Sequence, residues 1–419
     1  MNKVEDIYKR ITRRLPAELV ADLPKLTVLF IIWVCVILSV AYFASNELYG
    51  IRDYQTKEIV DGNKLQKVEP PEILEGLMRW DGPWYVDIAL NGYHKPHPTD
   101  TPGFETNRQV AFFPLYPTLI RAGLKVGLNP AVAAIGINIL LSFGCLLFIY
   151  LIALEQLKSR KLALRTSILF LFLPASFFLI SPYTEAVFCF FSFGAFYFAM
   201  KQRWLTANIF LAFCTASRSA GLIVALCIFL YYLHSHNWRW RSIDRSVLFF
   251  FIAPLGTILY ALYLWHTFNN PLLMLDAQKY WAQSIQPNIL LTLWDKTVDI
   301  VAAIATPGYD SFGGDYGKEW INLMTWGSFV SAGVICLWAY LRKNLSLPLA
   351  LYVVISLIFF ISKGNFISVN RYTLPLFPVY LLLVFYTRKS EFWFTILLAI
   401  SSIIMCFTLI QFSISYWAG

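Results

Sequence analysis

The sequence predicts an all-α membrane protein whose helices cross the bilayer many times. Of the 419 residues, 58% are hydrophobic and only 14% are charged, whereas soluble globular domains have about 25% charged residues. Phe, Trp and Tyr are abundant, at 35, 14 and 23 residues, and aromatic rings concentrate where membrane proteins meet the headgroup layer. The apolar residues also lie in long runs, as membrane helices of about 20 residues require.

Eleven apolar runs are candidate membrane helices, which predicts about 11 spans. The runs are 26–44, 131–154, 166–181, 185–200, 205–217, 220–234, 246–266, 321–341, 346–362, 373–387 and 392–414. The polar segment 1–25 is too long and too polar for a secretory signal, so we expect the first run to be retained as a span. Residues 26–419 are then expected to form a single transmembrane domain.

Positive charge predicts which side of the membrane each loop faces. With 1–25 in the cytoplasm, five short cytoplasmic loops hold thirteen Lys and Arg residues, and the short loops of the other face hold three. Cytoplasmic loops carry such an excess in most membrane proteins. The two long polar segments, 45–130 and 267–320, then lie on the non-cytoplasmic face, and so do the short polar segments 181–185 and 370–372.

Composition disfavours several other functions. The net charge is +9, but the positive residues form no basic stripe of the kind that binds nucleic acid. None of the seven cysteines forms a CxxC pair, and most lie in apolar runs, where cysteine packs as a small hydrophobic residue. No internal repeat is evident, although many secondary transporters contain one.

Residues 79–93, "RWDGPWYVDIALNGY", place an acid just before a predicted helix. Pro83 suits the first helical position and Gly92 the position after the end, so 83–91 is expected to be a short helix at the membrane interface. Asp81 has two possible roles. It could cap the helix, which contributes about 0.5–2 kcal/mol, or it could carry chemistry, and the local pattern does not choose between them.

Neighbouring polar segments have less specific patterns. The segment 107–128 is expected to form a second interfacial helix, because its prolines frame an apolar surface. His94 and His97 have a spacing that could bind a metal, but an exposed loop is the favoured interpretation. The Gly-rich, aromatic segment 308–320 is either a loop that contacts substrate or a solvated connector.

Several charges lie at the predicted outer ends of apolar runs, where a charge is costly without a partner. Glu185 could simply suit a helix start, or it could belong to a site. Arg218 lies between two runs with almost no loop, and Arg371 precedes another run. The planar fork of arginine suits a lipid phosphate; the alternative is that both pair with acids or headgroups. For Lys363, such pairing is the favoured interpretation.

Four pieces of sequence in this order resemble one family: "RWDGPWYVDIALNGY", "VAFFPLYP", "SPYTEAVF" and "SRSAGL", within 79–222. This family is that of the second mannosyltransferase of GPI-anchor assembly and its bacterial relatives, and "NRYTLPLFPVYLLL" is a looser match. The resemblance implies the C-type glycosyltransferase (GT-C) fold, with a catalytic first outer loop, here 45–130, that carries short interfacial helices. It also implies transfer of mannose from a polyprenyl-phosphate donor to a glycan or glycolipid acceptor, in a bacterial inner membrane by likeness to the bacterial branch.

The resemblance also implies roles for individual residues. Asp81 matches the catalytic base, and Glu185 and Arg218 match other polar positions of the motif. With their neighbours they form the expected substrate-binding set: Arg79, Trp80, Tyr183, Glu185, Arg218, Arg371 and Tyr372. The Gly-Pro pair after the acid and a long insert before "AFFP" depart from the family pattern, which leaves the acceptor and the exact sugar open.

Such a transfer is chemically consistent with one acid and two arginines on the same face. A sugar phosphate already has a good leaving group, so one carboxylate that takes the acceptor proton suffices for a single, inverting displacement. Arginines would stabilise the charge on the departing phosphate. No cofactor is required, and a divalent metal held by carboxylates is left open. The alternatives are a transporter or flippase of lipid-linked saccharides and a catalytically inactive scaffold.

Overall fold

The computed structural model describes residues 16–48, 65–94, 106–281, 286, 288–305, 316–363 and 368–416. Within these ranges the ordered elements are helices, and no strand occurs. The prediction of an all-α chain is therefore confirmed. Its two expected units, 1–25 and 26–419, stay a prediction, although the first helix already begins at Ala17.

The helices fall into two halves of the chain. The first half contains α2 (Ala17–Glu47), α4 (Glu72–Glu75), α5 (Gly82–Asn91), α6 (Leu115–Lys125), α7 (Pro130–Leu157), α8 (Arg160–Leu171), α9 (Glu185–Met200) and α10 (Trp204–Ser217). The second half contains α11 (Gly221–Ser235), α12 (Leu255–Phe268), α13 (Leu273–Asp276), α14 (Ile289–Ala305), α15 (Tyr316–Leu341), α16 (Leu347–Ile361), α17 (Val369–Tyr372), α18 (Phe377–Thr387) and α19 (Glu391–Ser413). Short 3₁₀ helices are η1 (Thr106–Ala111), η2 (Ser176–Leu179), η3 (Trp240–Ser242), η4 (Arg245–Phe251) and η5 (Ala277–Trp281).

Five helical stretches of the described chain are long and apolar enough to cross a membrane. They are Ala17–Glu47, Pro130–Leu157, Arg245–Phe268, Leu323–Leu341 and Glu391–Ser413. Five shorter apolar helices accompany them: α9, α10, α11, α16 and α18. Each predicted run thus contains helix, but the run 166–181 is interrupted where α8 ends at Leu171. The prediction of eleven spans is not confirmed, because the shorter helices do not reach the length of about 20 residues that a straight span needs.

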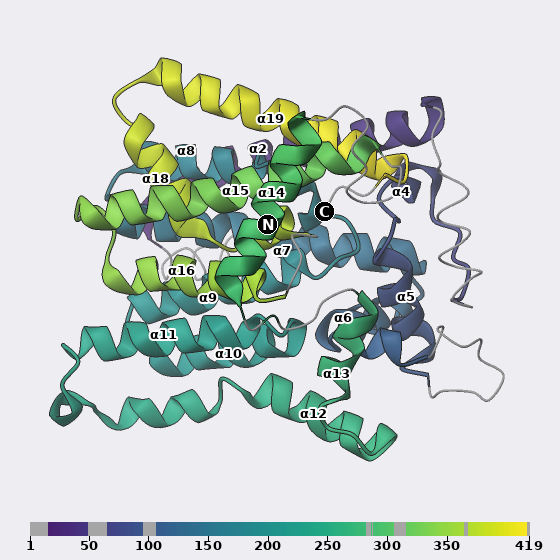
Figure 1. Cartoon of the computed structure of the whole chain (residues 1–419), viewed down its shortest axis with the longest axis horizontal. Coiled ribbons are helices and arrows are strands. Elements are labelled where there is room, and N and C mark those ends of the chain that lie inside the picture. The colour runs from purple at the N-terminus through teal and green to yellow at the C-terminus, as the bar shows by residue number, and fades with distance from the viewer. Residues whose placement is uncertain are drawn as a thin grey trace, which may run out of the picture.

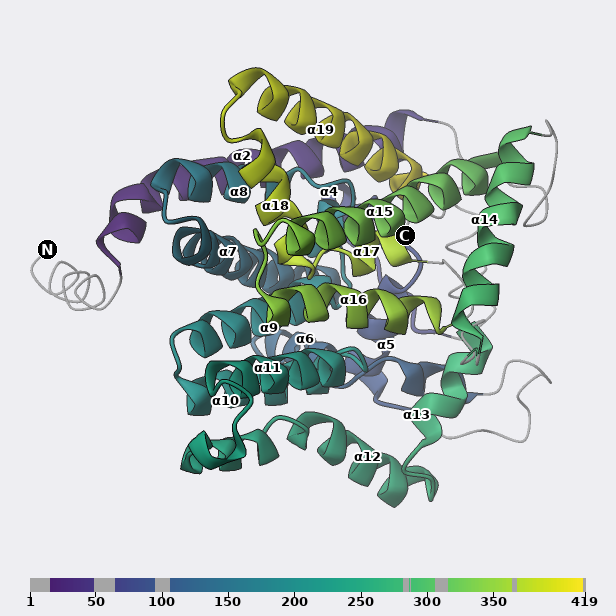
Figure 2. The same cartoon turned by 60° about the vertical axis from the view of Figure 1, so that its left-hand side comes forward.

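The long helices lie roughly parallel, in rows that run from α19 and α2 at one edge through α15 and α16 to α12 at the other (Figures 1 and 2). α9 packs against both α7 and α10 in the interior. In Figure 1, α4, α5, α6 and α13 lie toward one end of the bundle, and in Figure 2, α13 and α14 lie at the end opposite to the turns α9–α10, α15–α16 and α18–α19. The described parts of the two long polar segments therefore lie toward the same end of the bundle, and the side of the membrane that this end faces stays a prediction.

The described parts of the first long polar segment contain short helices at that end. The helix expected over 83–91 is present as α5, and the expected segment 107–128 forms η1 and then α6, which begins after Pro114. α5 is buried along Gly82–Ala89 and not only on one face. It packs against α6 and α7, so protein covers the helix on more than one side, and its position at the membrane interface stays a prediction.

Candidate active site

Asp81 stands at the N-cap position of α5, but its side chain makes no capping hydrogen bond. Instead, its Oδ2 accepts a hydrogen bond from Nη1 of Arg371 at 2.9 Å. The two residues are 290 positions apart in the chain. The carboxylate is thus directed away from its own helix and toward another segment, which disfavours the capping role, while its role in chemistry stays a prediction.

Glu185 and Arg218 continue this pairing into a chain of alternating charges. Oε1 of Glu185 accepts a hydrogen bond from Nη2 of Arg218 at 2.7 Å, and Nε of Arg371 lies 3.6 Å from the same oxygen. We call Asp81, Arg371, Glu185 and Arg218 the four-charge cluster. Removing buried charges from water is costly unless they are paired, and the side chains of Glu185 and Arg371 are only 1% and 6% exposed. Pairing explains how these ions are tolerated.

Aromatic rings support the cations of the cluster. The guanidinium carbon of Arg218 lies 4.7 Å from the ring centroid of Tyr372, and that of Arg371 lies 4.9 Å from the ring of Tyr183. The ammonium of Lys363 lies 5.2 Å from the Tyr372 ring. A cation over a ring is stabilised by the negative face of the π system. Burial raises the pKa of the Tyr372 phenol, but Arg371, Lys363 and Arg218 outweigh this effect and lower that pKa to about 8.

The cluster faces a cavity with an empty volume of about 680 Å³ that opens to the outside. Among the described residues, one acid and three cations line it: Asp81, Arg218, Lys363 and Arg371. The other lining residues are Tyr85, Ala111, Phe112, Phe113, Thr184, Ser217, Ser219, Gln278, Trp281, Ser368 and Tyr372. The excess of positive charge suits an anionic ligand, and the acid lies beside the cations.

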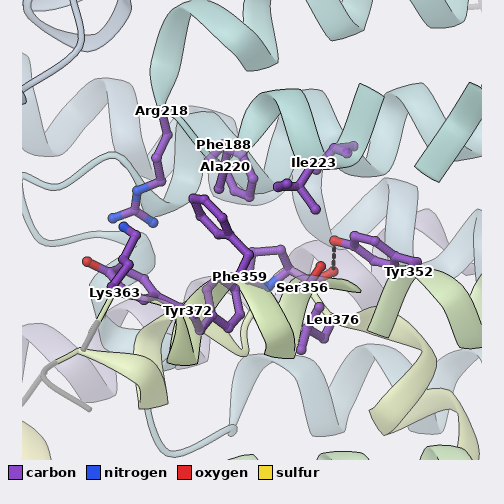
Figure 3. A pocket seen from close by; sticks show the side chains of 13 residues that line it. Phe188, Arg218, Ala220, Ile223, Tyr352, Ser356, Phe359, Lys363, Tyr372 and Leu376 are labelled. Atoms are coloured by element: carbon purple, nitrogen blue, oxygen red, sulfur yellow. Dashed lines mark hydrogen bonds between the residues drawn. The ribbon is translucent and has the colours of Figure 1, made fainter. Parts of the chain in front are cut away.

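A second, apolar pocket of about 410 Å³ adjoins this cavity. Arg218, Lys363 and Tyr372 line both spaces. Figure 3 shows the nitrogen-bearing ends of Arg218 and Lys363 close together at one end of the pocket, whereas Ile223 and Leu376 lie farther along it. The pocket is formed by α9, α11, α16 and the chain after α17. Arg218, Lys363 and Tyr372 therefore stand at the border between a charged space and an apolar one.

The predicted substrate-binding residues occupy three kinds of position. Arg218, Arg371 and Tyr372 line the cavity. Glu185 and Tyr183 are buried behind it and contact the arginines. Arg79 and Trp80 are not among the lining residues. Nε of Arg79 donates to the carbonyl oxygen of Ser413 at 3.1 Å, which ties the segment before Asp81 to the end of α19.

Sequence reasoning missed two lining residues that come from the second long polar segment. Gln278 and Trp281 of η5 line the cavity, and the Trp281 ring packs edge-on against Trp84 and Phe112. Nothing in the local pattern of 267–320 distinguishes these two residues. Of the predicted contact loop, 308–315 lies outside the described residues, and 316–320 forms the start of α15.

The two histidines considered as metal ligands are not brought together with further ligands in the described structure. Nε2 of His94 lies 3.1 Å from Oδ2 of Asp87, and His97 lies outside the described residues. Within the described ranges, no three His, Cys, Asp or Glu side chains form a group that could hold a metal ion. His94 instead contacts the buried acid of α5, which also accepts the backbone N–H of Gln66 at 3.0 Å.

Fold and site together define a class of protein: a helical membrane protein that holds an acid and three cations around a cavity beside an apolar pocket. The profile of the family described as "Mannosyltransferase (PIG-V)" matches residues 28–267. This is more than half of the chain, which therefore belongs to this family of membrane-bound mannosyltransferases. The resemblance found in the sequence motifs is confirmed for the family, while the assignment to a bacterial branch stays a prediction.

Individual relatives match over shorter regions. The chain is 27% identical over 177 residues to GPI mannosyltransferase 2 of Drosophila pseudoobscura pseudoobscura, which covers 39% of this chain and 36% of that protein. It is 29% identical over 162 residues to GPI alpha-1,6-mannosyltransferase 2 of Homo sapiens, covering 36% and 30%. The matches thus span about a third of each relative. Among solved structures, the crystal structure of the Archaeoglobus fulgidus oligosaccharyltransferase in the apo form aligns with 92% of this chain and 56% of that chain, at a TM-score of 0.46 and 14% identity.

Proposed function

We propose that this chain is an inverting membrane glycosyltransferase that moves mannose from a polyprenyl-phosphate carrier to a hydroxyl group of a glycan or glycolipid acceptor. The observation that carries the proposal is the junction of the charged cavity with the apolar pocket, where Arg218, Lys363 and Tyr372 line both. An amphiphile with an anionic head and an isoprenoid tail matches this junction. Membership of the mannosyltransferase family supports mannose as the sugar.

Asp81 is the proposed general base. Its carboxylate takes the proton of the acceptor hydroxyl while the acceptor oxygen forms a bond to the anomeric carbon of the sugar. The bond from that carbon to the phosphate oxygen breaks, and its electron pair leaves with the phosphate. A positioned base contributes about 10²–10⁴-fold to such a step. Support comes from the position of Asp81 in the cavity wall, where its carboxylate contacts Arg371 and makes no capping bond to its own helix.

Arg218, Arg371 and Lys363 are the proposed partners of the phosphate. The charge on the phosphate grows as the sugar leaves, and fixed cations in a site with little water stabilise such charge strongly. Arg218 is held by Glu185 and rests on the Tyr372 ring, so its orientation is set before the donor binds. The displacement requires no metal, because these side chains supply the positive charge.

The apolar pocket is the proposed site for the first isoprene units of the donor. Its wall contains Phe188, Ile223, Phe359 and Leu376, and burial of apolar surface contributes about 25 cal/mol per Å². The pocket starts at the cations that would hold the phosphate, so the tail can enter it without crossing polar groups. This gives the lipid a role in orienting the sugar toward Asp81.

The proposed orientation places the N-terminal segment in the cytoplasm and the cavity on the non-cytoplasmic face, in a bacterial inner membrane. The Lys- and Arg-rich turns lie at the end of the bundle opposite to α5 and α13 (Figure 2), which supports this orientation under the positive-inside rule. An epitope tag near residue 315 should then react with an impermeant reagent in intact cells. Labelling only after the cells are opened would contradict the orientation.

A donor screen with the purified protein tests the proposed activity. We expect transfer from polyprenyl-phosphate mannose, and at least tenfold less transfer from polyprenyl-phosphate glucose or from a nucleotide-linked mannose. The product should carry the sugar with inverted anomeric configuration, which NMR of the product measures. Flipping of lipid-linked saccharide in proteoliposomes without transfer would overturn the proposal in favour of a flippase.

A further inference from the structure

The residue before Asp81 has an unusual backbone conformation. Trp80 adopts a φ of 55°, a left-handed conformation that is rare for bulky residues. Holding a residue in such a conformation costs on the order of 1–3 kcal/mol and requires support from the surrounding structure. Because this turn sets the direction of the next residue, it determines that Asp81 faces Arg371 and the cavity.

The hydroxyl of Tyr183 bridges the backbone on both sides of this turn. It accepts the backbone N–H of Asp81 at 3.2 Å and donates to the carbonyl oxygen of Arg79 at 3.3 Å. Tyr183 is only 1% exposed, so these backbone groups are satisfied without water. One hydroxyl therefore holds the two peptide groups that flank Trp80.

The segment that carries Tyr183 is itself fixed from two directions. Nδ2 of Asn138, on α7, donates to the carbonyl oxygens of Ser181 and Tyr183, the latter at 2.9 Å. On the other side, a Cβ added at Gly82 would lie 2.7 Å from Cγ of Pro182. Real Cβ contacts are not this short, so the start of α5 approaches residue 182 as closely as glycine permits. This close approach explains why a glycine follows the acid, where the sequence departs from the family pattern.

We propose that Tyr183, Pro182 and Gly82 form a positioning clamp that keeps Asp81 directed at the cavity. Asn138 fixes the segment of Tyr183 to the core helix α7, and the Tyr183 hydroxyl in turn fixes the backbone of Asp81. Tyr183 does not line the cavity, so it acts on the reaction through Asp81 and not by contact with substrate. The role in catalysis rests on the proposed function, in which Asp81 is the base.

Removal of the hydroxyl alone tests the clamp. Tyr183→Phe keeps the ring against Arg371 and Phe178, so we expect the thermal unfolding temperature to stay within about 3 °C of the parent. We expect kcat to fall by about 10–100-fold with KM for the donor changed less than twofold, since a small displacement of a catalytic group is costly. Tyr116→Phe is the matched control, because its buried hydroxyl also donates to a backbone carbonyl, that of Ala134, at 3.1 Å but outside the cavity wall. An unchanged kcat in Tyr183→Phe, or an equal loss in the control, would overturn the proposal.

A second pair of variants tests the close approach. Gly82→Ala should lower kcat by about tenfold, because the new methyl group collides with Pro182 and shifts Asp81. Pro182→Ala removes Cγ and leaves Cβ at 3.7 Å, so the double variant should recover most of the lost activity. Equal activities of Gly82→Ala and the double variant would contradict the clamp.

Hydrogen exchange measured by mass spectrometry separates the clamp from the proposed activity. The amides of Asp81, Gly82 and Trp84 should exchange faster in Tyr183→Phe than in the parent, whether or not the protein transfers mannose, and exchange in α7 should be unchanged. If the parent transfers no sugar but this difference in exchange is found, the activity assignment fails and the clamp stands. If the exchange rates are equal, the clamp fails.

Discussion

Two clusters of acid and arginine lie at opposite ends of this bundle, and the four-charge cluster faces the cavity described above. At the end with the Lys- and Arg-rich turns, Asp22 of α2 accepts two hydrogen bonds from Arg160 of α8, at 2.9 and 2.7 Å. A third comes from the hydroxyl of Tyr150 on α7 at 2.7 Å. We call Asp22, Tyr150 and Arg160 the latch, because they join three helices around a single fully paired acid.

The four-charge cluster uses the same residue types in a different arrangement. Its members come from four separate parts of the chain, and Arg371 lies between two acids, at 2.9 Å from Asp81 and 3.6 Å from Glu185. Three cations line the adjoining cavity, with one acid, among the described residues. The difference shows that buried ion pairs do not by themselves indicate a site. A site is indicated where the charges are unequal and line a space that a ligand can enter.

Replacement of one acid in each cluster should give the largest difference in transfer activity between the two clusters. Asp81→Asn should lower kcat by about 10²–10⁴-fold, because the base is lost while the shape is kept, and its unfolding temperature should fall less than that of the latch variant, because Arg371 keeps Glu185 as a charged neighbour at 3.6 Å. Asp22→Asn should leave kcat within about twofold and lower the unfolding temperature, because Arg160 loses its charged partner. Transfer rates from radiolabelled donor and thermal unfolding of both variants measure the contrast. Retained activity in Asp81→Asn would disprove its role as the base.

Replacement of one arginine in each cluster should give the second largest contrast. Arg218→Lys keeps the charge but loses the planar fork, so we expect KM for the donor to rise by about 10–100-fold, as for the loss of one charged hydrogen bond. Arg160→Lys should leave KM unchanged. Initial rates over a range of donor concentrations measure this. An equal KM for both variants would mean that the four-charge cluster does not bind the phosphate.

The apolar pocket provides a contrast between donors. Ile223 lies in the pocket wall, so the larger side chain of Ile223→Trp should fill part of the pocket. The KM for a long-chain polyprenyl donor should then rise by about tenfold, the effect of losing roughly 1–2 kcal/mol of apolar burial. A donor that lacks the isoprenoid tail should lose less. Leu226→Trp is the control, since Leu226 lies on the same helix and is 45% exposed. A chain-length preference that is unchanged in Ile223→Trp would exclude this pocket as the tail site.

Tyr372 should give the smallest effect, a dependence on pH. Its pKa of about 8 means that a phenolate forms above that pH beside Arg218 and Lys363. Glu185 is the other charged group that acts on it, and it favours the neutral phenol. The phenolate would compete with the donor phosphate, so KM should rise by less than about tenfold between pH 7 and pH 9. Tyr372→Phe should show no such rise, and the same rise in that variant would assign it to another group.

Much of the fold followed from local patterns, because membrane helices are long and their composition is distinctive. All eleven apolar runs contain helix, and both Pro83 and Gly92 bound α5 as their backbone preferences predict. The length of the spans was harder to predict, since helices such as α10, with 14 residues, are too short for a straight crossing. Their position in the bilayer depends on packing against neighbours, which local patterns do not describe.

The candidate site was predictable where family motifs contributed and not elsewhere. Asp81, Glu185, Arg218 and Arg371 were singled out, but the sequence did not show that they pair with one another. Gln278, Trp281 and the role of Tyr183 were missed, because their function depends on neighbours 100 or more positions away, as the bond between Asp81 and Tyr183 over 102 positions illustrates. Contacts at such separation carry no periodic signal.

By itself, the sequence determined a helical membrane protein and the family to which it belongs, and it predicted the side of the membrane on which the polar segments lie. It did so because hydrophobic runs, loop charge and short motifs are local properties of the chain. Only the tertiary structure decided what Asp81 does at the start of α5. A carboxylate at that position can cap its own helix, but Trp80 and Tyr183 direct it toward Arg371 instead. That choice depends on packing between segments that are far apart in the chain.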